Sequence, residues 1–226
     1  MEIQETRDGS HTIYSDAFEA PYHSKYGAIQ ESEHVFIEAA LLPAMQDHST
    51  LKILEIGFGT GLNALLTFVN AINKGVNIEY TAYEYYPVSL EILQQLNFYK
   101  YLDKFENAKA LQNWLHHTEW DEQILFDNSI NTTIHLHKVK DKFEHIKYSN
   151  EFDIIYFDAF APIAQPELWT EQMFTQMYEA LVPGGVLTTY CAKGQVRRNI
   201  RAAGFIMQSL PGPVGKWEMT RAVKPL

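Results

Sequence analysis

The chain has very little cysteine and no long apolar run, and each shortage excludes a class of protein. A single cysteine, Cys191, stands in 226 residues, which excludes a disulfide framework and a cysteine-rich metal site. No apolar stretch approaches the ~20 residues that a transmembrane helix requires. The first residues are polar and lack the apolar core of a signal peptide. We therefore expect a cytoplasmic protein with no membrane contact.

Basic residues are also scarce, and they are placed unevenly. The chain has 18 Lys and Arg against 28 Asp and Glu, a formal net charge of −10, which argues against indiscriminate binding to nucleic acid. Residues 193–226 nevertheless hold seven Lys or Arg and one acid, Glu218. This basic end favours local contact with a phosphate-bearing substrate, although a solvated helix face is the alternative. The candidate cations are Lys193, Arg197, Arg198 and Lys216.

The stretch 53–63 organises the rest of the chain. An apolar run at 51–56 is typical of a buried parallel strand, and an apolar pattern at helical spacing begins at Leu62. Between them lie three alternate glycines, Gly57, Gly59 and Gly61. Glycine lets the backbone approach a ligand closely, and such strand–turn–helix units bind nucleotide-like ligands. A tight turn without a ligand is the alternative.

The glycine spacing differs from the G-x-G-x-x-G dinucleotide fingerprint. Glu55 precedes the first glycine by two positions, and an acid there suits a cationic amino-acid moiety better than a pyrophosphate. The Glu-x-Gly-x-Gly-x-Gly order resembles motif I of class I S-adenosylmethionine-dependent methyltransferases. We therefore expect S-adenosylmethionine as the cofactor.

Two further acids complete the expected cofactor pocket. Glu84 ends the expected strand 78–84, where an acid accepts hydrogen bonds from ribose hydroxyls; an exposed strand-end acid is the alternative. Asp141 follows the expected strand 132–139, where an acid contacts the adenine amino group.

Asp158 is the candidate catalytic residue. It ends the strongly apolar strand 151–158, whose carboxyl end adjoins the glycine loop at the switch point of a doubly wound sheet. An amine acceptor is mostly protonated near neutrality, because the pKa of an alkyl ammonium is roughly 10. A nearby carboxylate can orient the ammonium and relay its proton, although Asp158 as a helix cap is the alternative. Phe160 and Pro162 follow as candidate substrate contacts, with stacking on a base or core packing both open for Phe160.

Strands and helices alternate along the chain, which predicts an α/β fold with a doubly wound, mainly parallel sheet. We expect residues 1–50 to form an N-terminal extension with a hairpin and a helix, and 51–226 to form the methyltransferase domain. A helical insertion is expected at about 99–131. The adjacent pair His116 and His117 lacks supporting acids or cysteines, so we expect no metal.

Several motifs together resemble one family, the methyltransferase domain of bacterial tRNA 5-methylaminomethyl-2-thiouridine biosynthesis enzymes (MnmC-like). The resemblance covers about residues 14–223. It rests on the stretches 22–37, 55–63 (EIGFGTGLN), 157–162 (FDAFAP), 165–170 (QPELWT), 194–198 (GQVRR) and 215–219 (GKWEM).

The resemblance implies a fold and a reaction. The fold is the Rossmann-like class I methyltransferase fold with a seven-stranded sheet. The reaction uses S-adenosylmethionine to convert 5-aminomethyl(-2-thio)uridine to 5-methylaminomethyl(-2-thio)uridine at the tRNA wobble position. Bifunctional members also carry an FAD-dependent oxidase domain. Because this chain ends at Leu226 without one, we expect a stand-alone methyltransferase, with a separate FAD-dependent oxidase acting upstream.

Other readings of the same residues stay open. One is a class I methyltransferase that acts on another amine or a small metabolite. A second is an aminopropyltransferase of the spermidine-synthase type, and a third is a non-catalytic cofactor- or RNA-binding subunit. A nicotinamide dehydrogenase is disfavoured by the glycine spacing.

Overall fold

The computed structural model describes residues 1–102, 105–127 and 132–226. A central sheet has the strand order β10-β11-β9-β8-β4-β5-β7-β6. Its five central strands, from β9 to β7, are parallel, and β11 and β6 pair antiparallel at the two sides. The strands are β4 (Thr50–Ile56), β5 (Asn77–Tyr83), β6 (Gln123–Asp127), β7 (Thr133–Val139), β8 (Phe152–Phe157), β9 (Leu181–Thr189), β10 (Ile206–Pro211) and β11 (Glu218–Val223).

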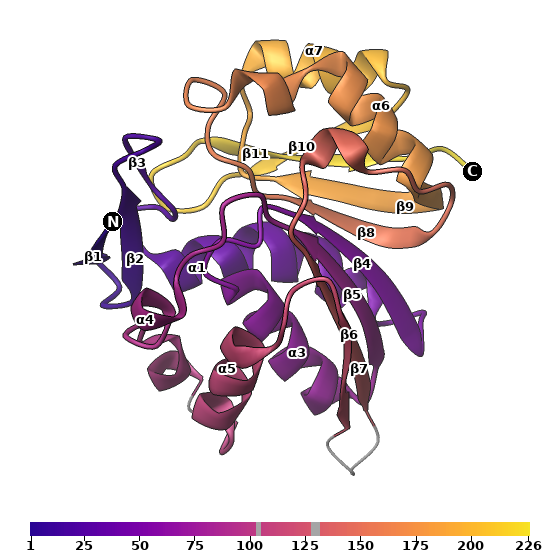
Figure 1. The fold of residues 1–226 in the computed structure, drawn as a ribbon. Coiled ribbons are helices and arrows are strands. Elements are labelled where there is room, and N and C mark those ends of the chain that lie inside the picture. Colours follow the sequence, from indigo (N-terminus) through magenta and orange to yellow (C-terminus); the bar gives the residue numbers. More distant parts are fainter. Residues whose placement is uncertain (103–104, 128–131) are drawn as a thin grey trace.

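Helices cover both faces of this sheet (Figure 1). The central strands are apolar on both sides: in β4, Leu51 and Ile53 belong to one buried cluster, and Leu54 and Ile56 to the other. One face carries α1 (Ala28–Ser32), the π-helix η1 (Glu33–Leu41), α2 (Leu42–Ala44), α3 (Leu62–Lys74), α4 (Leu90–Leu93) and α5 (Ala108–His117). The other carries α6 (Glu171–Ala180) and α7 (Gly194–Ala202). The doubly wound, mainly parallel sheet predicted from the alternating pattern is therefore present.

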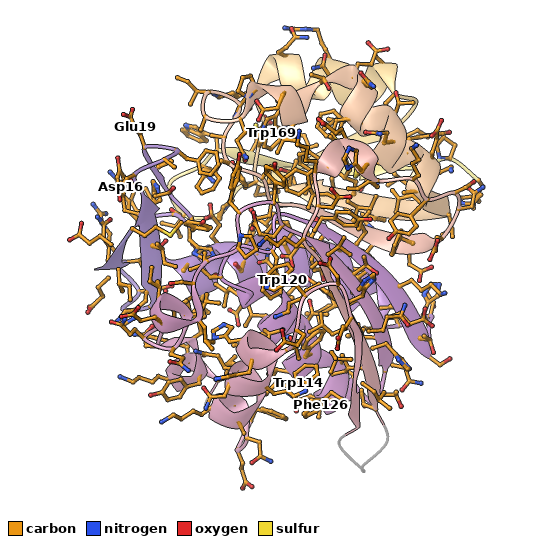
Figure 2. The ribbon with its side chains drawn as sticks, in the orientation of Figure 1. Asp16, Glu19, Trp114, Trp120, Phe126 and Trp169 are labelled. Atoms are coloured by element: carbon orange, nitrogen blue, oxygen red, sulfur yellow. The ribbon has the colours of Figure 1, made fainter. Side chains whose placement is uncertain are left out.

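Short 3-10 helices connect several of these elements. They are η2 (Phe98–Tyr101), η3 (Phe143–His145) and η4 (Pro166–Trp169). Trp169 lies on the side of the sheet that α6 and α7 cover (Figure 2). Its indole Nε1 donates to the carbonyl of Phe160 at 2.8 Å, which fixes the loop after β8.

The first 50 residues hold a small three-stranded sheet followed by the helical stretch 28–44. The strands are β1 (Glu2–Glu5), β2 (His11–Ser15) and β3 (Ala20–Pro21). His23, just after β3, has ring nitrogens 3.3 Å from the hydroxyls of Thr12 and Thr60. Burial lowers the pKa of His23 to about 4, so the ring is neutral near pH 7. It ties the small sheet to the glycine loop.

The segment 99–131 differs from the helical insertion expected there. It contains η2 and α5, but also β6, which pairs with β7 and makes the sheet eight-stranded rather than seven-stranded. Trp114 of α5 packs on Phe126 of β6 with ring centroids 4.8 Å apart (Figure 2). The apolar run in β6, from Ile124 to Phe126, does not alternate and is too short to separate a strand from a helix by pattern. Residues 103–104 and 128–131 of this segment lie outside the described ranges.

No helix within the described part of the chain is long and apolar enough to cross a membrane.

Candidate active site

A pocket of about 280 Å³ opens at the carboxyl ends of β4, β5 and β8. Six of the residues singled out from the sequence line it: Gly57, Gly59, Glu84, Asp158, Phe160 and Lys216. Glu55, Gly61, Asp141, Pro162, Lys193, Arg197 and Arg198 do not. The pocket thus joins the glycine turn to the block after β8, as the switch-point argument predicts.

The glycine turn is pressed between neighbouring backbone and side chains. Gly57 has φ +90°, and a Cβ there would lie 2.7 Å from the carbonyl oxygen of Asp158. Gly59 has φ +50°, and its Cβ would lie 3.0 Å from the Tyr22 ring. Both positions therefore require glycine, both for the backbone angle and for the space. Gly61 has another use: it precedes α3 as its N-cap.

Glu84 stands directly after β5 and faces the glycine turn. Its carboxylate accepts a hydrogen bond from the Gly59 amide at 3.1 Å and from the Tyr86 amide at 2.9 Å. Burial raises the pKa of Glu84, whereas these amide bonds favour the charged form. The carboxylate therefore lies on the pocket wall with its position fixed by the loop.

Glu55 lies beneath the turn instead of on the pocket wall. Its side chain is 0% exposed, and burial raises its pKa well above the ordinary value. Its Oε1 accepts from Asn63 Nδ2 at 2.9 Å, and Oε2 has no hydrogen-bond partner among the described residues. The expectation that Glu55 faces the cofactor directly is corrected: β4 alternates, and position 55 points under α3 rather than to the strand end.

Asn63 joins the two halves of the site, and the sequence reasoning assigned it no role. Its Nδ2 donates to Glu55 Oε1 and to Asp158 Oδ2, both at 2.9 Å. Its Oδ1 is buried without a partner among the described residues, although the side chain lines the pocket. An unpaired buried acceptor is costly, so this atom suits a ligand that donates a hydrogen bond. The available signal was a polar residue in the first turn of an otherwise apolar helix.

Asp158 stands directly after β8 with its carboxylate partly buried. Burial raises its pKa to about 7, and the Glu31 charge adds to this rise. The hydrogen bond from Asn63 and the charge of Lys216 act in the opposite direction. Asp158 therefore changes protonation near neutral pH, as a group that exchanges protons requires.

Residues from distant segments surround Asp158. Lys216 Nζ lies 2.6 Å from Glu31 Oε1 and 3.9 Å from the centre of the Tyr190 ring. Glu31 Oε2 also accepts from the Ser24 amide at 2.7 Å, and the Tyr190 hydroxyl donates to the Ala159 carbonyl at 2.9 Å. Lys216 was predicted from the sequence, but Glu31 and Tyr190 were not. Neither lies in a local motif, and the Lys216–Glu31 pair spans 185 positions.

Aromatic rings form another wall of the pocket. Phe160 stacks on Phe18 with centroids 4.4 Å apart and 24° between the planes, and Tyr22 meets it edge-on at 4.8 Å. The Phe160 amide donates to Gln165 Oε1 at 3.0 Å. Phe160 is thus half-buried and lines the pocket. Pro162 is half-buried, outside the pocket wall.

Asp141 lies apart from the pocket. Its Oδ1 accepts from the Lys142 amide at 2.7 Å and lies 2.8 Å from His145 Nδ1, which together lower its pKa. Phe143, two residues later, lines the pocket instead. The Asp141 carboxylate therefore bonds within its own turn and does not face the pocket, so the structure does not bring it to the position expected for an adenine contact.

The two candidate arginines of α7 have different surroundings. Arg197 is 16% exposed, pairs with Glu218 at 2.8 Å, and also donates to Thr220, Ser209 and the Met219 carbonyl. It therefore holds the β10–β11 hairpin against α7. Arg198 is exposed and donates to Gln195 at 2.7 Å, and Lys193 is exposed just before α7.

No group of three or more His, Cys, Asp or Glu side chains suited to a metal ion occurs in the described ranges.

Comparisons with known proteins show the family to which the chain belongs. A family model described as S-adenosyl-L-methionine-dependent methyltransferase matches residues 102–225. Among curated proteins, the tRNA 5-methylaminomethyl-2-thiouridine biosynthesis bifunctional protein MnmC of Pseudomonas fluorescens (strain Pf0-1) is 31% identical over 216 residues. The protein of that name from Cupriavidus necator is 32% identical over 217 residues. Each alignment covers 92% of this chain and 32% of the relative, so this chain spans about one third of their length.

Solved structures show the same fold. The structure of MNMC2 from Aquifex aeolicus has a TM-score of 0.78 at 22% identity and covers 100% of this chain and 72% of that chain. Spermidine synthase from Thermotoga maritima has a TM-score of 0.54 at 15% identity, covering 99% and 72%. The predicted class I methyltransferase fold is confirmed, and the chain belongs to the family of S-adenosylmethionine-dependent methyltransferases.

Proposed function

We propose that this chain methylates the aminomethyl nitrogen of 5-aminomethyl(-2-thio)uridine at the tRNA wobble position. The family supplies the methyl donor. The names of the curated relatives, which align over nine tenths of this chain, support the tRNA substrate. The observation that carries the proposal is Asp158, a carboxylate with a pKa of about 7 on the pocket wall beside the glycine turn.

The pocket fits S-adenosylmethionine. Gly57 and Gly59 leave room that a Cβ would fill, Glu84 offers acceptors for ribose hydroxyls, and the unpaired Asn63 Oδ1 suits the amino group. When bound, the cofactor supplies an electrophilic methyl group on its sulfonium. The chain's own residues must then bring an unprotonated amine to that methyl group.

The acceptor side is suited to a protonated amine. Lys216 is itself an ammonium bound in this way. Its Nζ lies 2.6 Å from the Glu31 carboxylate and 3.9 Å from the centre of the Tyr190 ring. A substrate ammonium meets the same neighbours and, in addition, Asp158. Asp158 Oδ1 has no protein donor among the described residues, so it is free to accept the ammonium proton and leave a lone pair on nitrogen.

The aromatic wall suits a flat base. Phe160, stacked on Phe18 and flanked by Tyr22, presents apolar ring surface next to Asp158. A uridine turned out of the anticodon loop can lie against such a surface, as bases do in single-strand recognition. This arrangement supports the proposal that the ring and its aminomethyl substituent bind in one pocket.

The proposal extends to partners and location. A tRNA substrate places the protein in the cytoplasm. The curated relatives are named bifunctional, and we propose that a separate FAD-dependent oxidase supplies the aminomethyl uridine to this chain.

The test is a methylation assay with purified protein, labelled S-adenosylmethionine and tRNA that carries 5-aminomethyluridine. Nucleoside analysis should show labelled 5-methylaminomethyluridine with the wild type and at least about 10²-fold less with Asp158→Asn. Methylation of small amines but not of tRNA contradicts the substrate assignment. Turnover only with decarboxylated cofactor points to aminopropyl transfer instead.

A further inference from the structure

Three exposed side chains and one half-buried ring lie next to the pocket, and none of them belongs to the site described above. We call them the rim face, and they are Arg7, Lys25, Tyr26 and Trp217. Trp217 is 97% exposed. Burying an indole is favourable by roughly 2–3 kcal/mol. A fully exposed tryptophan next to a pocket therefore indicates a surface that binds a partner.

Trp217 is held in place by the loop that joins β10 to β11. The Gly212 amide donates to the Trp217 carbonyl at 3.0 Å, and the Lys216 amide donates to the Pro213 carbonyl at 2.9 Å. The neighbouring Lys216 side chain reaches into the pocket. Trp217 is therefore one residue away from the pocket wall, on a loop closed by two backbone hydrogen bonds.

The N-terminal segment lies against the same loop. The Tyr26 ring packs on Gly215, where a Cβ would run into it. In Figure 1 the yellow C-terminal segment accordingly passes beside the indigo N-terminal strands. Above the Tyr26 ring stand the Arg7 guanidinium, 4.7 Å from its centroid, and Lys25 Nζ at 5.6 Å.

The two cations of the rim face have no acidic partner within 4.0 Å among the described residues. Three other cations of this acidic chain are held by a carboxylate: Lys52 by Glu79, Arg197 by Glu218 and Lys216 by Glu31. Arg7 and Lys25 are also joined through their backbones, because the Arg7 amide donates to the Lys25 carbonyl at 3.0 Å. The chain therefore presents a small fixed positive patch beside an exposed indole.

We propose that the rim face binds the anticodon-loop nucleotides next to the target uridine. Trp217 stacks on a neighbouring base, and Arg7 and Lys25 contact the flanking phosphates. Aromatic stacking with backbone cations is how unpaired RNA is held, and it leaves the target base free to enter the pocket. This inference rests on the proposed tRNA substrate and names where that RNA lies.

The first test compares Trp217→Ala with Trp217→Phe. Loss of one stacked base should raise the Kd for tRNA about 5- to 100-fold in Trp217→Ala, whereas the phenylalanine variant keeps most of the affinity. The Kd for S-adenosylmethionine should stay within twofold, because Trp217 does not line the pocket. A tRNA Kd within twofold of the wild type in both variants overturns the stacking contact.

The second test uses charge, with a control at the other end of the molecule. Lys74 ends α3, which begins at the glycine turn, so about 20 Å separates it from the pocket. Lys25→Glu should weaken tRNA binding and reduce the slope of log K against log salt by about 0.7–0.9, whereas Lys74→Glu makes the same change in net charge with little effect. Equal effects of the two variants overturn the phosphate contact.

These measurements separate this inference from the proposed function. If the wild type binds S-adenosylmethionine but methylates no tRNA, the proposed function fails. If the wild type methylates tRNA and the rim-face variants bind it normally, the proposed function stands and the rim face is wrong.

Discussion

The two halves of the pocket differ in how the chain builds them. Gly57, Gly59 and Glu84 come from one strand–turn–helix unit and the strand beside it. Glu31, Tyr190 and Lys216 come from three distant segments that meet only in the folded protein. The cofactor half is therefore a local structure whose requirements are steric, whereas the acceptor half depends on tertiary packing and on charge.

The largest effect expected in the acceptor half follows from Asp158→Asn. The amide cannot take a proton from the amine, so we expect kcat to fall about 10²- to 10⁴-fold. The Kd for S-adenosylmethionine should change by less than threefold, since Asn keeps the side-chain shape. Single-turnover methylation and calorimetric cofactor binding measure the two quantities. If kcat and the affinity for S-adenosylmethionine fell by the same factor, the cofactor half and the acceptor half of the pocket would not act separately.

The pH dependence of kcat/KM and of stability follows from the pKa of Asp158. Because burial raises the pKa of Asp158 to about 7, the carboxylate that accepts the proton forms only as pH rises through 7, and kcat/KM should rise with it. A raised carboxyl pKa also means that this group's contribution to stability is present below the unfolded value and is lost as pH rises to about 7. Asp158→Asn should accordingly flatten the profile and raise Tm at pH 8 more than at pH 5.

The corresponding test of the cofactor half is Gly57→Ala. A methyl group there would lie 2.7 Å from the Asp158 carbonyl and adopt a φ of +90°. We expect S-adenosylmethionine affinity to fall at least about tenfold, because the contact forces the turn to shift. The positive φ, which costs about 1–2 kcal/mol, lowers stability as well.

Gly75→Ala is the matched control for that variant. Gly75 has φ +70° but nothing within 4 Å of its added Cβ, so it shares the backbone strain and not the contact. It should lower Tm and leave cofactor affinity unchanged. Weakened cofactor binding in both variants would assign the effect to strain alone.

A smaller effect distinguishes two adjacent arginines of α7, Arg197 and Arg198. Arg197→Ala removes the contacts that hold β10 and β11 to α7, so we expect a loss of about 1–3 kcal/mol in the free energy of unfolding. Arg198→Ala, on the exposed side of the same helix, should lose less than about 0.5 kcal/mol. Denaturant titration measures both. A destabilised Arg198→Ala together with an unaffected Arg197→Ala contradicts the assignment.

The smallest expected effect is that of Glu55→Gln. Because burial raises the pKa of Glu55 well above its ordinary value and so disfavours the charged form, a neutral amide of the same size should change cofactor affinity less than about threefold. Glu55→Ala, which leaves a cavity beside Asn63, should weaken it more. If Glu55→Gln loses as much cofactor affinity as Gly57→Ala, then the Glu55 charge itself acts on the cofactor.

The sequence predicted most of the fold, because its main signals are local. Buried runs, glycine turns and helical periods identified β4, β5, β8 and α3 and the doubly wound order. The edge strand β6 was not predicted, because five residues are too few to distinguish a strand from a helix by their pattern.

The site was predictable where one motif carries it. Gly57, Gly59, Glu84 and Asp158 stand at strand ends, and topology alone brings those ends together. Glu31 and Tyr190 could not be found, because their role depends on which side chains pack opposite them. Arg197 shows a different limit of sequence reasoning. Its charge suggested a contact with a phosphate-bearing substrate, whereas in the structure its guanidinium pairs with Glu218.

The Asn63 amide sets a limit on how freely this protein can be redesigned. Substitutions of Glu31, Lys216 or Tyr190 would alter the choice of nucleophile without touching the turn that holds the donor. Asp158 has no such independence, since the amide that orients it also bonds to the buried Glu55 under that turn. A new acceptor specificity is therefore reached most directly by keeping Asn63 and Asp158 as an inseparable pair and varying the residues around them.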